Sequence, residues 1–209
     1  MIDGQLAGIG PGIATGVGLE RTGRDWFRAM GLLGGLGVIV LVRWAATVAG
    51  AADALSIGLG FGGALVALAI PASRPRTRPA LLAIPIGLAG GALLVGLALI
   101  ARVDGPGPSL APAAAFAPWA AITVLVATGE ELILRGVLFT ALERAGGVVV
   151  AVAVTSVAFA LMHVPLYGWH VVPLDLGVGI FLGGLRLAGG GSTGPAIAHA
   201  VADLATWWL

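Results

Sequence analysis

The sequence predicts an all-α fold, a polytopic bundle of about seven transmembrane helices around a polar cavity. Of the 209 residues, 58% are hydrophobic and only 10% are charged. The mean hydropathy of +1.04 lies far above the range of water-soluble domains. The apolar residues also form runs of about 20, the length that an α-helix needs to cross a bilayer. The thirty-five glycines agree with this fold, because glycine lets transmembrane helices approach closely.

Seven apolar runs follow one another along the chain. The predicted transmembrane helices cover residues 27–49, 55–71, 80–101, 118–143, 146–164, 172–188 and 194–209. Residues 1–26 are Gly-rich and mildly polar, and we expect a flexible N-terminal tail there. The densest polar motifs lie near the C-terminus. We therefore divide the remaining chain into accessory transmembrane helices, residues 27–111, and a core, residues 112–209.

The charged residues predict the orientation of the bundle and exclude several functions. All eleven basic residues are arginine, and the densest basic loop is Ser73–Arg78. Because cytoplasmic loops are rich in basic residues, this loop and the N-terminus are predicted to be cytoplasmic. The all-arginine, Ala- and Gly-rich composition suggests a prokaryotic plasma membrane. The chain has no cysteine, which excludes disulfides, and its net charge of +1 argues against nucleic-acid binding.

An acidic pair and an arginine interrupt the fourth predicted span. Glu130, Glu131 and Arg135 lie within six residues, and each charge costs roughly 2.5 to 3.5 kcal/mol in a membrane if nothing compensates it. Glu131 and Arg135 are four residues apart, so they share a helix face and can form an ion pair. Glu130 lies about 100° around the helix and lacks that partner. Such a carboxylate accepts a proton readily, as a general base must.

Two further spans carry a histidine with a second residue one helical turn away. Phe159 and His163 are four residues apart, and so are His199 and Asp203. Because polar groups that face lipid are costly, we expect these side chains and Glu130 to share one cavity. A carboxylate and an imidazole can deprotonate a water there, while a second imidazole donates to an oxyanion. These are the groups that amide hydrolysis requires.

The three motifs resemble those of the CPBP family in order and spacing. They are E-E-x-x-x-R at Glu130–Arg135, F-x-x-x-H at Phe159–His163 and H-x-x-x-D at His199–Asp203. The family contains the CAAX prenyl endopeptidases and the Abi-like proteins of bacteriocin processing and self-immunity. The resemblance covers roughly Pro112–Leu209, and the first three spans match the family only in being hydrophobic.

The resemblance implies a glutamic-type intramembrane protease that needs no cofactor and acts on a peptide or membrane-protein substrate. Glu130 would activate a water, assisted by His163. His199 and Asp203 would stabilise the oxyanion. The best-known eukaryotic members have asparagine at the position of Asp203, and an aspartate can donate to an oxyanion only when it is protonated. The supporting residues implied by the motifs are Glu131, Arg135 and Phe159.

Several alternatives stay open. Glu130, His163 and His199 could bind a zinc ion, although the chain lacks the H-E-x-x-H helix of many zinc proteases. Buried Glu and His also build proton relays, so a proton-coupled transporter or a non-catalytic immunity protein uses the same residue types. Ser192 lies in a formal G-x-S-x-G match, but about 10 Å of helix would separate it from His199, so we expect a helix cap. A prokaryotic source leads us to expect a substrate other than a farnesylated CAAX protein.

Overall fold

The computed structural model describes residues 11–70, 81–101 and 115–209, and every regular element in these ranges is helical. The all-α prediction is therefore confirmed. The basic loop that predicted the orientation lies outside the described residues. The α-helices are α1 (Pro11–Val48), α2 (Ala54–Ala69), α3 (Ala83–Ala101), α4 (Phe116–Glu131), α5 (Phe139–Tyr167), α6 (Val172–Gly189) and α7 (Thr193–Ala205).

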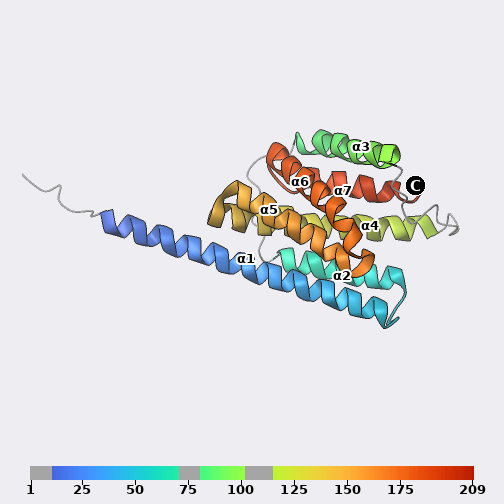
Figure 1. Ribbon diagram of the computed structural model, residues 1–209, viewed down its shortest axis with the longest axis horizontal. Helices are drawn as coiled ribbons and strands as arrows, with labels where there is room; N and C mark the ends of the chain where they lie inside the picture. The colour runs from blue at the N-terminus through green and yellow to red at the C-terminus, as the bar shows by residue number, and fades with distance from the viewer. Residues whose placement is uncertain (1–10, 71–80, 102–114) are drawn as a thin grey trace, which may run out of the picture.

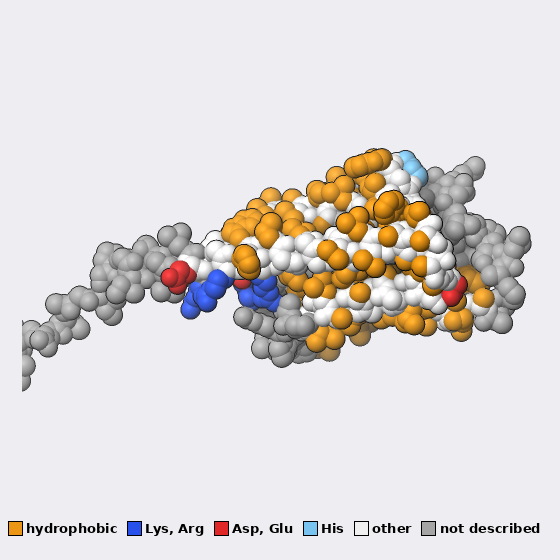
Figure 2. All heavy atoms as spheres, turned by 90° about the horizontal axis from the view of Figure 1, so that it is seen from below, with side chains coloured by type: hydrophobic (Ala, Val, Ile, Leu, Met, Phe, Trp, Pro, Cys, Tyr) orange, Lys and Arg blue, Asp and Glu red, His pale blue; other side chains and the backbone are white. Residues whose placement is uncertain are grey.

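Four helical stretches of the described chain are long and apolar enough to cross a membrane. They are Glu20–Val48, Ala83–Ile100, Phe116–Tyr167 and Trp169–Gly189. The predicted count of about seven spans is not confirmed, because α2 and α7 are shorter and Phe116–Tyr167 counts as a single candidate, although it bends at Gly147. Hydrophobic side chains dominate the face shown in Figure 2, and charged side chains gather toward its ends. A bundle with this exterior is an integral membrane protein.

Two boundaries differ from the predicted ones. Helix α1 already begins at Pro11, so residues 11–26 are helical where the sequence predicted a flexible tail. In Figure 1 the N-terminal part of α1 extends beyond the other helices. The predicted span 146–164 ends just before Pro165, but α5 continues through this proline to Tyr167. A proline removes only one backbone donor, so a helix can run for one or two residues beyond it.

Gly147 divides α5 into two parts. Its φ of 86° and ψ of 174° are not helical, and glycine adopts such values without steric cost. The break lies next to the predicted gap between residues 118–143 and 146–164. The longer second part of α5 carries the F-x-x-x-H motif back across the bundle.

Glycines bring the accessory helices close to the helices that carry the polar motifs. Helix α3 lies beside α7 (Figure 1), and a Cβ atom at Gly87 would lie only 2.7 Å from the carbonyl oxygen of Gly194. A Cβ atom at Gly91 would meet the Val201 side chain at the same distance. Small residues at such contacts let transmembrane backbones approach closely, where van der Waals packing holds them. Helix α7 is thus fixed from one side by α3.

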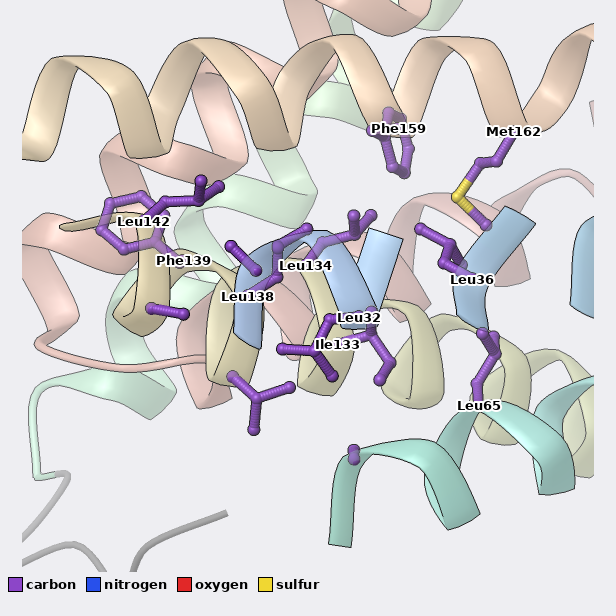
Figure 3. Packing of buried hydrophobic residues seen from close by; sticks show 14 of the residues in the cluster. Leu32, Leu36, Leu65, Ile133, Leu134, Leu138, Phe139, Leu142, Phe159 and Met162 are labelled. Carbon is purple, nitrogen blue, oxygen red and sulfur yellow. The ribbon is translucent and has the colours of Figure 1, made fainter. Parts of the chain in front are cut away.

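One apolar cluster joins α1, the segment after α4, and α5. Leu36, Leu134 and Phe159 belong to it, and Figure 3 shows them together with Met162 in one region between these elements. Leu134 is fully buried, and Phe159 is only 3% exposed. This cluster packs directly against the polar groups described next.

Candidate active site

A π-helical segment follows the acidic pair. Helix α4 ends at Glu131, and Leu132–Leu138 form a π-helix before α5 begins. π-Helical turns are rare and occur frequently at functional sites. The segment keeps Glu131 and Arg135 within reach of each other and leaves Glu130 on the last turn of α4.

Glu131 and Arg135 form the ion pair that their spacing predicted. Arg135 Nη1 donates to Glu131 Oε1 at 2.7 Å, and both side chains are fully buried. Arg135 Nη2 also donates to the carbonyl oxygen of Gly179 on α6 at 3.0 Å. The guanidinium carbon lies 4.8 Å from the centre of the Phe159 ring, in cation–π range. Arg135 therefore connects α4, α5 and α6.

Three carboxylates surround the His199 ring. Its Nδ1 atom lies 3.1 Å from Glu131 Oε1, and its Nε2 atom lies 3.4 Å from Asp203 Oδ2 and 3.8 Å from Glu130 Oε2. Glu130 is 2% exposed and His199 5%, whereas the Asp203 side chain is 40% exposed. The site thus combines a buried carboxylate–imidazole contact with one partly exposed carboxylate.

The Phe159 ring separates the two predicted catalytic histidines. It meets His163 edge-on at 4.8 Å between ring centres and His199 edge-on at 5.4 Å. The structure therefore brings Glu130, His199 and Asp203 into direct proximity, and it places His163 across an aromatic ring from His199.

Three residues near the site were missing from the sequence prediction. Asp175 of α6 lies 3.5 Å from His163, measured from Oδ2 to Nδ1, and Tyr167 stacks on the same imidazole at 5.9 Å between centres. Arg43 of α1 lies 4.3 Å above the Phe61 ring, and its charge interacts with Glu130. The sequence contained a signal for two of these three residues. Asp175 and Arg43 are ionisable residues inside predicted spans, which by itself marks a candidate functional group.

The residues of the zinc alternative, Glu130, His163 and His199, do not form one cluster in this structure. In the described part of the chain, no three His, Asp or Glu side chains are placed so that they could hold one ion. His199 directs Nδ1 at Glu131, and His163 directs Nδ1 at the carbonyl oxygen of Phe159, 2.9 Å away. These contacts hold the two rings in separate orientations.

Comparison with known proteins relates the region that contains these residues to one family. Residues 112–205 match the family described as type II CAAX prenyl endopeptidase Rce1-like, which confirms the resemblance to the CPBP family over this region. No curated protein matches the chain. No solved structure matches it either.

Proposed function

We propose that this chain is an intramembrane endopeptidase in which Glu130 activates the attacking water, since residues 112–205 match the Rce1-like type II CAAX prenyl endopeptidase family. The observation that carries the proposal is the contact of a buried carboxylate, Glu130, with the imidazole of His199 on a different helix. Burial of either group without the other would be costly, because an uncompensated polar group in the membrane is unfavourable.

The reaction begins with proton transfer from water to Glu130. His163 holds the same water, and the water oxygen forms a bond to the carbonyl carbon of the peptide. The carbonyl oxygen becomes an oxyanion and accepts a hydrogen bond from Nε2–H of His199, whose charged form the surrounding carboxylates stabilise. When the C–N bond breaks, Glu130 returns the proton to the leaving nitrogen, so atoms and charge balance.

The remaining groups keep this arrangement fixed. Glu131 accepts from Nδ1–H of His199, and this leaves Nε2 as the nitrogen available to the substrate. Arg135 neutralises Glu131 and ties it to α6. Asp203 is the most exposed of the three carboxylates, which supports a role for it in contact with the entering peptide. In its protonated form it would add a second donor to the oxyanion.

The test is Glu130→Gln in the full chain, purified in detergent. A Gln side chain cannot take a proton, so kcat should fall at least about a hundredfold, the lower end of what a general base contributes. The thermal unfolding midpoint should stay near that of the unmodified protein. The matched control is Glu143→Gln, which makes the same change at an exposed residue of α5 and should leave cleavage intact. Full activity of Glu130→Gln would overturn the proposal.

Two further measurements separate the alternatives. Metal analysis of the active protein, with activity after chelation, distinguishes the water mechanism from a zinc-dependent one. Proton uptake by reconstituted vesicles distinguishes a protease from a proton-coupled transporter. Peptide uptake or binding without cleavage by the unmodified protein would favour a transporter or an immunity protein.

The family match indicates the class of substrate and not its identity. The family description points to a prenylated C-terminal peptide, whereas the composition of this chain favours an unprenylated peptide of a prokaryotic membrane. Cleavage of matched peptides with and without the prenyl group decides between them. Accessibility labelling of a cysteine placed near the N-terminus tests the proposed cytoplasmic orientation.

A further inference from the structure

We propose that Asp175 is a positioning residue that fixes the His163 ring and strengthens its hold on the attacking water. The inference rests on the proposed function, because it assigns a task to the partner of His163. Asp175 belongs to none of the three motifs and lies on a different helix from His163.

The contacts of Nδ1 determine which nitrogen of His163 faces the reaction. Nδ1 lies 2.9 Å from the carbonyl oxygen of Phe159. A carbonyl oxygen only accepts hydrogen bonds, so Nδ1 must carry the hydrogen and donate. In the neutral ring, Nε2 is then the atom with a free lone pair. His163 therefore presents Nε2 as the acceptor of a hydrogen bond from the attacking water.

Asp175 supplies what the carbonyl group cannot, a negative charge. Its Oδ2 atom lies 3.5 Å from the same Nδ1 atom, and the two side chains are only 18% and 17% exposed. As Nε2 accepts a hydrogen bond from the water, partial positive charge develops on the ring, and a carboxylate at this distance in a poorly hydrated setting stabilises it. The arrangement is a carboxylate–imidazole pair assembled from two helices.

The chain reversal after α5 places Asp175 beside the ring. Gly168 has a φ of 87°, which favours glycine, and a short 3₁₀ segment, Trp169–Val171, leads into α6. Asp175 lies in the first turn of α6, where the helix dipole favours a negative charge. The reversal thus returns the first turn of α6 to the end of α5, next to His163.

A series of contacts joins Asp175 to the proposed catalytic groups. Asp175 contacts His163, and the Phe159 ring lies edge-on against both His163 and His199. Each proposed catalytic histidine therefore has its own aspartate. His199 has Asp203 one turn along the same helix, and His163 has Asp175 across a helix interface.

Aromatic neighbours restrict the remaining freedom of the His163 ring. Phe159 meets it edge-on, and Tyr167 stacks on it with an angle of 30° between the planes. These contacts limit tilting of the ring, and the two acceptors near Nδ1 limit its rotation. Loss of the carboxylate alone should therefore change the charge near the ring more than its location.

The kinetic test compares Asp175→Asn and Asp175→Glu with a control, Asp25→Asn on α1. The asparagine side chain keeps the shape but removes the charge, so we expect kcat to fall roughly tenfold or more, a part of the 10²- to 10⁴-fold that acid–base groups contribute. KM should stay nearly constant, because Asp175 acts through His163. Asp175→Glu should recover part of kcat, and Asp25→Asn should behave like the unmodified protein.

A spectroscopic readout tests the contact without any reference to cleavage. The chain has only three histidines, so ¹⁵N-histidine labelling gives three pairs of ring signals in detergent. The signals of unmodified His163 should show Nδ1 protonated and Nε2 unprotonated. Asp175→Asn should shift the His163 signals, while those of the exposed His170 serve as an internal reference.

The outcomes separate this inference from the proposed function. If Glu130→Gln abolishes cleavage while Asp175→Asn keeps full kcat and leaves the His163 signals unchanged, the inference fails and the protease assignment stands. If Glu130→Gln stays active, the proposed function fails, and the His163 signals still report whether Asp175 contacts the ring. A parallel fall in kcat and thermal midpoint in both Asp175 variants, without a His163-specific shift, would show a structural role and overturn the inference.

Discussion

The helices of the two halves of this chain are held together by different forces. In α4–α7, Arg135 bonds to Glu131 and to the Gly179 carbonyl group, and His199 bonds to Glu131. In α2 and α3 the close contacts are made by glycines. A Cβ atom at Gly62 would lie 2.9 Å from Leu125 of α4, and one at Gly87 would lie 2.7 Å from the backbone of α7.

The difference shows how a small membrane protein supports a polar site. Lipid provides no hydrophobic drive between helices, so close packing and polar contacts must provide the association. The C-terminal half uses polar contacts between groups of the proposed active site. The N-terminal half packs against α4 and α7 from outside through apolar contacts, so it adds support with few additional buried charges.

The largest effect that tests this contrast is expected from Arg135→Met. The change leaves Glu131 buried without its ion-pair partner, and breaking a buried pair costs about 3 to 5 kcal/mol of unfolding free energy. Denaturant unfolding in mixed micelles measures the loss. The double variant Glu131→Leu/Arg135→Met removes both charges and should be less destabilised than Arg135→Met alone. If Arg135→Met loses no more unfolding free energy than the double variant, the ion pair contributes little to the stability of the C-terminal half.

A smaller effect is expected in the N-terminal half from Gly87→Ala. The new methyl group would lie 2.7 Å from the Gly194 carbonyl oxygen, so α3 and α7 must separate, at a cost of about 1 to 3 kcal/mol. The matched control is Gly96→Ala on the same helix, where a Cβ atom would meet no atom within 4 Å. Because α7 carries His199, activity should also fall in Gly87→Ala. If the two variants are equally stable, glycine packing does not hold α3 against α7.

The smallest effect is expected at Asp53, the exposed N-cap residue of α2. It accepts hydrogen bonds from the Ser56 hydroxyl at 2.6 Å and the Ser56 amide at 3.0 Å, and the first of these is the main reason that its pKa lies below the ordinary value. A lowered folded-state pKa means that the stabilisation is present at neutral pH and disappears as the pH falls through that pKa.

Thermal unfolding at two pH values measures this contribution. Asp53→Ala should lower the midpoint slightly at pH 7, and the difference from the unmodified protein should shrink at about pH 3. Ser56→Ala removes the hydroxyl donor and should show the same trend with a smaller amplitude. A difference that grows on acidification would contradict the assigned role of the cap.

Local spacing explains which parts of the site were predictable. The Glu131–Arg135 pair lies within one helical turn, so the positions of the two residues in the sequence were enough to predict it. The same holds for His199 and Asp203, which are 3.4 Å apart. The contacts of His199 with Glu131 and of His163 with Asp175 join residues of different helices, and spacing along the chain predicts neither.

The span count and the start of the first helix could not be read from hydropathy. A run of apolar residues predicts burial in lipid, but it does not state whether one long helix or two short ones contain it. Residues 11–26 are mildly polar, but they extend the helix that the following apolar segment forms. Gly147 interrupts α5 although many other glycines leave their helices intact.

The sequence by itself determined that this protein is helical and lies in the membrane, and it predicted that Glu130, His163, His199 and Asp203 share one site. Its motifs also indicated the family that residues 112–205 match. Only the tertiary structure decided which helices meet, that His199 lies among three carboxylates, and that α6 brings Asp175 to His163. The physical reason is that helical periodicity fixes the relative positions of residues within one turn, whereas contacts between helices depend on how whole surfaces pack.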